Sequence, residues 1–371
     1  MRIRPLYFFW PYLLPFLCRP YRESSGFFGK NPIDKVTKLR SEFRNRKARR
    51  DIFLLCLLIL LLPFTPKTSA VFAAQEVWML DSYRACWLHA SEEEYEKIRT
   101  YRLENCHWVK SNQEEFHETF DTDVPLIIFV PGYTSTPQQT VDVGMMLVRH
   151  FDPRMSGRTV FWNWPSEKKS EWITSDIRAK MPVASASSDY LVHFLRSLKP
   201  NSKVCIFGFS FGNRIVLDAV ERLGEDRPEG LRIRLVLAGA ATDRNFLARN
   251  HRNGNVPAIA EKILIFYNPL DRALLVYPFI YGNDYKPEAL GRYGPPICSI
   301  QPQFRNRIES IDVFSQVGIR HITAVSMDAP AFRQRIKTYF FFDGDQENEE
   351  TMQAPNLRYA NEKNAPTPAS Y

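Results

Sequence analysis

A serine between two glycines, Ser210 between Gly208 and Gly212, is the clearest chemical signal in this sequence. The apolar run Val204–Phe207 ends at the first of these glycines. After the second glycine, apolar residues recur at helical spacing, at Val216, Ala219, Val220 and Leu223. A strand, a sharp corner and a helix in this order raise a serine hydroxyl above a sheet, at the positive amino end of the helix. We therefore interpret Ser210 as a nucleophile; a plain Gly-Ser turn is the alternative.

A serine hydroxyl is a weak nucleophile, so it needs a general base and an acid that orients the base. In a parallel sheet, such groups follow the carboxyl ends of strands. The predicted strand Ile263–Tyr267 leads into Asp271, and a last predicted strand, Ile311–Phe314, is followed by His321. We expect His321 to be the base and Asp271 the acid.

The other histidines and acids are weaker candidates. Five of the seven histidines precede Ser210 in the chain, and His251 lies in a polar loop. Asp243 is the alternative acid, because it follows the predicted strand Leu231–Leu237. Some hydrolases carry the acid of the triad after the corresponding strand. Its other interpretation is the cap of a helix. Asp312, inside the last predicted strand, is the third choice.

An acyl-transfer reaction also needs two N–H donors for the developing oxyanion. The backbone amide of Phe211, directly after the serine, is one candidate. The other is the amide of Tyr133, in the turn Pro131-Gly132-Tyr133 that follows the predicted strand Val124–Val130. The glycine permits a close approach of the backbone at this point. A Pro-Gly turn without a catalytic role is the alternative.

Strands alternate with helical segments along the chain, and this alternation predicts a mostly parallel sheet. The other expected elements are strands at 77–80, 106–109 and 158–164, helices at 92–100 and 188–198, and a last helix with Phe332, Ile336, Tyr339 and Phe340 on one face.

The order of serine, acid and histidine, together with the pattern Tyr-x-x-x-Asp-x-Ala-Leu at Tyr267–Leu274, resembles the bacterial α/β-hydrolases, within an uncharacterised esterase- and lipase-like group. The similarity extends over residues 76–340. It implies an α/β-hydrolase fold, with a mostly parallel central sheet and helices on both faces. It also implies that Ser210, Asp271 and His321 form the triad.

The sequence departs from many α/β-hydrolases in two ways. Pro131 stands where the family has a histidine. This difference leaves the backbone N–H of Tyr133 available as the second donor. Only about twenty residues separate Asp243 from Ile263, too few for a large cap domain. The aromatic and proline-rich segment Val276–Phe304 either overhangs the site or packs on the surface.

The charge distribution argues against nucleic acid as a partner. The chain of 371 residues has a net charge of +8, but residues 1–50 hold 13 Lys and Arg against 3 Asp and Glu. Because this segment alone carries +10, the remaining residues carry −2. The body of the protein is therefore not basic.

The basic segment runs into an apolar stretch, Ile52–Leu62, which has the length of a signal-peptide core. Small residues follow, with cleavage expected around Ala70 or Ala73. We favour export, to the periplasm or the cell exterior, with cleavage; a retained anchor at residues 52–64, which would associate the protein with a membrane, is the alternative. The charged region is unusually long, and a later translation start is one explanation.

Three regions follow from these patterns. Residues 1–74 form the leader, residues 75–342 the α/β-hydrolase domain, and residues 343–371 a tail. The tail opens with Asp343–Glu350, where five of eight residues are acidic, and it is expected to be disordered.

Six cysteines are present, and two of them, Cys18 and Cys56, lie in the leader. Cys86 and Cys106 would be able to pair across an early hairpin in an oxidising compartment. Cys205 is expected to be a buried small hydrophobe inside the strand before Ser210. No cysteine or histidine spacing indicates a metal site.

The sequence therefore predicts a serine hydrolase that cleaves a carboxylic ester or thioester, with a small-molecule or lipid-like substrate. Neither a metal nor an organic cofactor is expected. Two alternatives remain: a catalytically inactive hydrolase-fold binding protein of the cell envelope, and an amidase or peptidase with the same triad.

Overall fold

The structure is a computed structural model, and it describes residues 75–87, 90–150, 157–224, 226–280 and 286–342. The predicted leader, with its cleavage or anchor segment, Cys18 and Cys56, lies outside the described residues, and so does the acidic tail.

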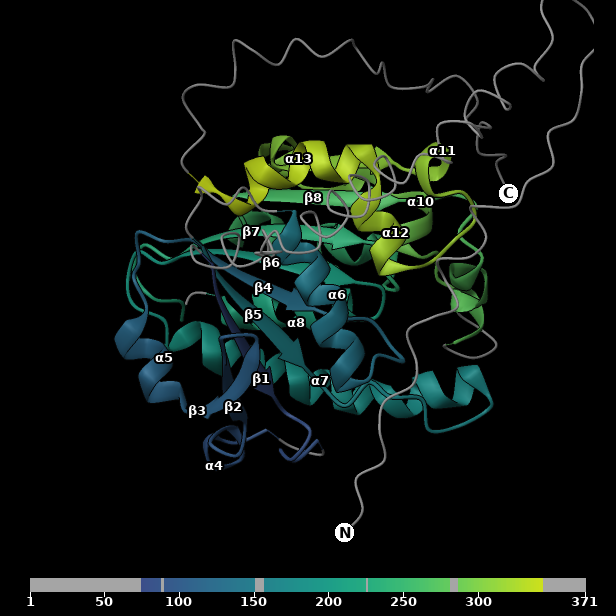
Figure 1. The fold of residues 1–371 in the computed structure, drawn as a ribbon. Coiled ribbons are helices and arrows are strands. Elements are labelled where there is room, and N and C mark those ends of the chain that lie inside the picture. Colours follow the sequence, from purple (N-terminus) through teal and green to yellow (C-terminus); the bar gives the residue numbers. More distant parts are fainter. Residues whose placement is uncertain (1–74, 88–89, 151–156, 225, 281–285, 343–371) are drawn as a thin grey trace, which may run out of the picture. The chain divides into compact units, whose positions relative to one another are not determined.

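Nine strands of the described residues form one sheet, in the order β3-β2-β1-β5-β4-β6-β7-β8-β9 (Figure 1). Only the pairs β1–β2 and β2–β3 are antiparallel. The strands are β1 (Gln75–Asp81), β2 (Arg99–Glu104), β3 (His107–Ser111), β4 (Leu126–Val130), β5 (Gly157–Asn163), β6 (Lys203–Phe209), β7 (Arg232–Ala238), β8 (Lys262–Tyr267) and β9 (Ile308–Asp312).

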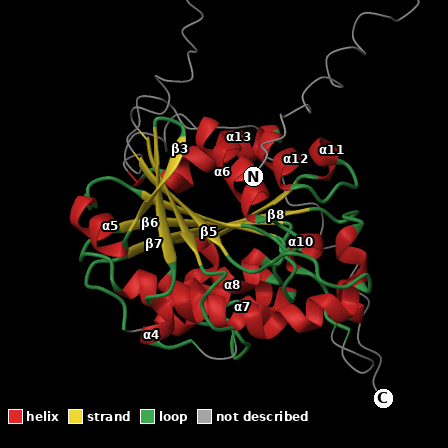
Figure 2. Ribbon diagram, turned by 60° about the horizontal axis from the view of Figure 1, so that its bottom comes forward, coloured by secondary structure: helices red, strands yellow, loops and turns green. Residues whose placement is uncertain are grey.

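Helices cover both faces of the sheet (Figure 2). On one face lie α6 (Pro137–Arg149), α12 (Thr323–Asp328) and α13 (Pro330–Phe340), and on the other lie α7 (Ile173–Arg196) and α8 (Gly212–Leu223). The shorter elements are α4 (Glu92–Tyr95), α5 (Gln113–Thr119), η1 (Arg244–Leu247), α9 (Val256–Ile259), η2 (Ala273–Phe279), α10 (Leu290–Tyr293), η3 (Ile297–Ser299), η4 (Pro302–Arg307) and α11 (Phe314–Val317). Within the described residues, each helix is too short or too polar to cross a membrane.

Alternation along the strands divides the core into two layers. Ile128 of β4 and Ile206 of β6 pack with the layer that holds α7 and α8. Their neighbours Phe129 and Phe207 pack in the opposite layer, with α13. Because both faces of the sheet are covered, β4 is apolar at every position and β6 and β7 are apolar at most positions, as is typical of parallel sheets.

The predicted fold is confirmed, but three predicted boundaries are wrong. The segment 92–100 is helical only to Tyr95, because Arg99–Glu104 instead pairs with β1 as the first strand of a hairpin. The helix predicted from Ser188 begins at Ile173. The pattern did not indicate its first half, because that half buries polar residues and contains Pro182. The last strand ends at Asp312, and Phe314 opens α11.

The four described cysteines are not joined in disulfides, and Cys86 and Cys106 therefore remain thiols here. Cys205 is fully buried in β6, as expected. Burial raises the pKa of its thiol, because the thiolate would lose its hydration, and Cys205 stays a neutral core residue.

One ion pair fixes α8, the helix that follows Ser210, to the loop after η1. Asp218 is buried, and its two oxygens accept hydrogen bonds from Arg252 Nε at 2.8 Å and Nη2 at 2.7 Å. Asn253 Nδ2 donates a third, at 3.1 Å. Burial alone would raise the pKa of Asp218, but Arg252, Asn253 and Arg214 together outweigh it and lower the pKa.

We expect Asp218→Asn to lower the free energy of unfolding by about 1–3 kcal/mol at neutral pH, because a buried acceptor of charged donors is lost. The folded-state pKa is lowered, so the carboxylate stabilises the fold above its ordinary pKa of about 3.9, and this stabilisation disappears as the pH falls through the folded-state pKa. Denaturant unfolding of both proteins at neutral and acidic pH measures the difference.

Asp226→Asn is the matched control, because Asp226 also pairs with an arginine, Arg196, at 3.0 Å, but its side chain is 79% exposed. Its loss should change the free energy of unfolding by less than about 1 kcal/mol. A penalty for Asp218→Asn that is the same at both pH values would contradict the assignment.

Candidate active site

Ser210 lies at a strained corner between β6 and α8. Its φ is +51°, a left-handed conformation that residues with side chains rarely adopt. The glycines on either side are required by space. A Cβ on Gly208 would lie 2.5 Å from Asn213 Oδ1, and a Cβ on Gly212 would lie 2.4 Å from the carbonyl oxygen of Pro131. Any side chain at either position would force the strand, the helix or the neighbouring loop apart.

Hydrogen bonds hold the backbone of Ser210 in this conformation. Its N–H donates to the carbonyl of Ala238 at 3.0 Å. Its own carbonyl accepts from the N–H of Ala241 at 3.1 Å and from Asn213 Nδ2 at 3.1 Å. Asn213 Nδ2 also donates to the carbonyl of Ala238 at 3.0 Å, and Asn213 is fully buried. The sequence analysis did not identify Asn213 as a residue that supports Ser210. Its position three residues after the serine was the one feature of the sequence that could have indicated this role.

The structure brings the three predicted triad residues together. His321 Nε2 lies 2.8 Å from Ser210 Oγ, and His321 Nδ1 lies 2.6 Å from Asp271 Oδ2. The partners assign the imidazole protons: Nδ1–H faces the carboxylate, which leaves Nε2 to accept the serine proton. The side chain of Asp271 is 3% exposed and that of His321 is 13% exposed, so the chain of hydrogen bonds runs from the interior to the surface.

The acid and the histidine are held to each other by more than their own contact. Asp271 Oδ1 accepts from the N–H groups of Ala273 at 3.0 Å and Leu274 at 3.2 Å, which leaves Oδ2 for the imidazole. The buried Asn268 donates from Nδ2 to the carbonyl of Gly318 at 2.6 Å. This bond clamps the acid loop to the loop that carries His321.

The imidazole of His321 lies against two residues at the ends of neighbouring strands. Its ring centroid lies 5.0 Å from that of Phe209. Below it, Gly239 has φ of +52°, and a Cβ there would lie 3.1 Å from His321 Cε1. Because Gly239 has no side chain, the imidazole of His321 can occupy this position.

The two predicted oxyanion donors lie on adjacent loops because of the register of the sheet. Val130 of β4 pairs with Gly208 of β6, so the turn after β4 emerges beside the serine corner. A Cβ on Gly132 would lie 2.9 Å from Ser210 Cβ. The N–H groups of Tyr133 and Phe211 have no hydrogen-bond partner among the residues that the structure describes. Two free donors therefore flank the serine corner.

The loop that carries Tyr133 is anchored to the segment after β5. Trp164 Nε1 donates to the carbonyl of Pro131 at 2.9 Å, and the N–H of Thr134 donates to the carbonyl of Ser166 at 2.9 Å. The hydroxyl of Tyr133 donates to Asp176 Oδ2, at 2.5 Å, on the first turn of α7. Burial and the Asp176 carboxylate raise the pKa of Tyr133, so the phenol keeps the proton it donates.

The alternative acids take structural roles. Asp243 is buried and caps η1, since its Oδ1 accepts from the N–H of Asn245 at 2.9 Å. Asp312 is exposed, and its Oδ1 accepts from the N–H of Phe314 at 2.8 Å in a local turn. The partner of His321 Nδ1 is Asp271. The segment 276–304 includes residues outside the described part, so its two predicted positions, over the site or packed on the surface, both stay predictions.

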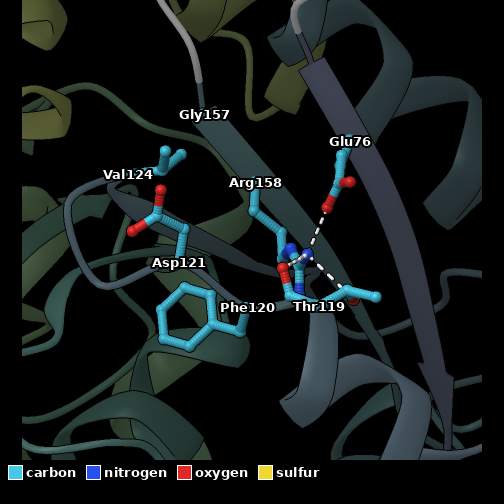
Figure 3. Close-up of a pocket in the computed structure, with 7 residues that line it drawn as sticks. All are labelled: Glu76, Thr119, Phe120, Asp121, Val124, Gly157 and Arg158. Carbon is cyan, nitrogen blue, oxygen red and sulfur yellow. Dashed lines mark hydrogen bonds and ion pairs between the residues drawn. The ribbon is translucent and has the colours of Figure 1, made fainter.

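A pocket of about 190 Å³ lies at the other end of the sheet, near the amino ends of β1 and β5 (Figure 3). Arg158 lines it, but its guanidinium already donates to the carbonyls of Phe116 at 2.6 Å and Thr119 at 2.7 Å and pairs with Glu76. The polar groups of Arg158 are therefore used in contacts within the protein, and we assign no binding role to this pocket. No cluster of three metal-ligating side chains occurs among the described residues.

The parallel sheet, the strained serine corner after a central strand and the helices on both faces define the α/β-hydrolase class. Residues 109–295 match the family described as alpha/beta hydrolase of unknown function, DUF900, over half of the chain, and the protein belongs to this family.

Solved structures to which the chain is similar include esterase B from Lactobacillus rhamnosis, with 11% identity and a TM-score of 0.33, over 84% of this chain and 96% of that one. Another is lipase B from Aspergillus fumigatus, with 10% identity and a TM-score of 0.34, over 60% of this chain and 57% of that one. At such low identities and TM-scores, these likenesses carry no argument about this chain. No curated protein sequence matches the chain.

Proposed function

We propose that the protein is a serine hydrolase that cleaves a carboxylic ester or thioester through an acyl-serine intermediate. The observation that carries the proposal is the continuous chain of hydrogen bonds from Ser210 Oγ through His321 to Asp271, at 2.8 Å and 2.6 Å, which starts at a strained corner. A structural serine has no need of such a corner, whereas a nucleophile gains an exposed hydroxyl from it.

In the proposed reaction, Ser210 Oγ attacks the carbonyl carbon while its proton passes to His321 Nε2. Asp271 stabilises the imidazolium by accepting the hydrogen bond from Nδ1–H. The N–H groups of Tyr133 and Phe211 receive the oxyanion. The proton on Nε2 then goes to the leaving alcohol or thiol as the C–O or C–S bond breaks. Water, with His321 again as the base, hydrolyses the acyl-serine to a carboxylic acid and returns the proton to Ser210.

We expect Ser210→Ala to abolish labelling by a fluorophosphonate probe and to lower kcat/KM for p-nitrophenyl acetate by about 10⁴-fold or more, because the substitution removes the hydroxyl that His321 would activate. Ser315→Ala is the matched control, since Ser315 is exposed in α11 and should leave labelling unchanged. Absence of labelling and of hydrolysis in the folded wild-type protein would favour the inactive binding protein instead. Cleavage of anilides in preference to the matching esters would favour the amidase.

Two conservative substitutions separate the candidate acids. Asp271→Asn should lower kcat by about 10³- to 10⁴-fold, because the amide no longer holds the imidazole in the required tautomer. Asp243→Asn should leave kcat within about twofold of the wild type, since asparagine caps a helix as well as aspartate does. Steady-state kinetics with a soluble ester measure both variants. A larger loss for Asp243→Asn would contradict the assignment of Asp271.

We also propose that the protein is exported and cleaved after its apolar stretch, which residues 52–62 support by their length and the small residues that follow. We expect N-terminal sequencing of the native protein to find a start just after Ala70 or Ala73. Recovery of a chain that retains residues 52–64 would instead support a membrane anchor.

A further inference from the structure

Exposed apolar side chains gather on three segments around the candidate site. Eight of the twelve large apolar side chains exposed in the described residues belong to these segments, and we call them the apolar rim: Trp172, Ile173, Leu270, Leu275, Val276, Phe279, Ile319 and Ile322. Trp172 is 79% exposed and Phe279 is 57% exposed. A gathering of this kind marks an interaction site more often than single exposed residues do.

Hydrogen bonds join the three segments into one surface. Arg178 of α7 donates from Nε to the carbonyl of Ile280 at 2.6 Å and from Nη2 to that of Phe279 at 3.1 Å, which ties the first turns of α7 to η2. The N–H of Arg272 donates to the carbonyl of Ile319 at 3.3 Å, which ties the start of η2 to the loop between α11 and α12. These contacts therefore place the three segments that carry the apolar rim side by side.

The apolar rim also adjoins the candidate catalytic residues. Leu270 precedes Asp271, and Ile322 follows His321. On α7, Ile173 lies one turn before Asp176, which holds the side chain of Tyr133. In Figures 1 and 2, α11 and α12, which flank the His321 loop, lie beside α10 at one edge of the sheet. A surface that contacts the apolar rim therefore lies next to Ser210.

The charges on the same segments are mainly positive. The exposed basic residues are Lys168, Lys169, Arg178, Arg272 and Arg320. The acidic residues that are not buried there are Glu171, which pairs with Lys168 at 3.0 Å, and Glu167. Residues 51–371 as a whole carry a net charge of −2, whereas the three segments expose five basic residues and two acidic ones.

We propose that the apolar rim docks on an anionic phospholipid bilayer, from which an ester-bearing lipid reaches Ser210. The inference rests on the proposed hydrolase function. Apolar side chains enter the headgroup boundary, while arginine and lysine pair with anionic headgroups. A second copy of the chain is the less suitable occupant, because a symmetric dimer would set two positive rims against each other.

The experiment compares the full chain with Trp172→Ser/Phe279→Ser in sedimentation with vesicles of phosphatidylcholine and phosphatidylglycerol in equal amounts. We expect binding to weaken by at least about tenfold, because two large apolar side chains are lost from the contact. Binding of the wild type should also fall with added salt and be weaker on phosphatidylcholine alone. The N-terminal segment is the same in both proteins, so the difference reports the apolar rim.

Ile173→Ser and Val109→Ser form a matched pair, because the two side chains are 47% and 43% exposed and Val109 lies on β3 at the far edge of the sheet. Only the first should weaken vesicle binding, with both variants unchanged in circular dichroism and thermal midpoint. Equal binding by all variants, or a dimer in sedimentation velocity that the rim substitutions dissociate, would overturn the docking surface.

Hydrolysis of soluble p-nitrophenyl acetate by the wild type reports the hydrolase function separately. Vesicle binding that depends on the apolar rim, without any such hydrolysis, would support the docking surface and overturn the enzyme. Hydrolysis together with vesicle binding that the rim substitutions do not change would support the enzyme and overturn the docking surface.

Discussion

The left-handed backbone of Ser210, with φ of +51°, is a conformation that costs a residue with a side chain of order 1–3 kcal/mol. It persists because the surroundings offer no relaxed alternative. Glycines at 208 and 212 let β6, α8 and the turn after β4 approach to distances that no Cβ would allow. Asn213 then satisfies the carbonyl groups of both Ser210 and Ala238, at 3.1 Å and 3.0 Å. The position of the hydroxyl is thus a property of packing around the corner.

The sheet register places the loops that carry the other candidate residues next to Ser210. Phe209 pairs with Ala238, Ala238 with Phe266, and Tyr267 with Asp312, so β6, β7, β8 and β9 end at a common edge. Loops separated by up to 111 residues in sequence consequently leave the sheet side by side. Because each loop leaves a rigid parallel strand, the distances between hydroxyl, imidazole and carboxylate are set by backbone pairing.

Much of this arrangement is legible in the sequence, and the rest is hidden for identifiable reasons. The Gly-x-Ser-x-Gly corner and the apolar strands that end before Ser210 and Asp271 indicate the fold, because strand ends and glycine spacing are local signals. Asn213 and Asn268 act through bonds to distant carbonyls, and a polar residue in a loop or helix gives no local sign of such a partner. The first half of α7 was missed because it buries Asp176 and Lys180, which break the apolar pattern of a helix.

The bond between Asn268 and Gly318 joins two positions that are fifty residues apart, one just before Asp271 and the other just before His321. The chain between these positions is fastened at further points, since Arg178 donates to the carbonyl of Phe279, Ala289 pairs with Asp243, and β9 pairs with β8. A change of chain length between Phe279 and Ala289 therefore falls between two fixed points, and it can alter the surroundings of the candidate site while Asp271 and His321 keep their positions. For protein engineering, this marks a stretch where a loop library can vary the surroundings of the candidate site without displacing Asp271 or His321.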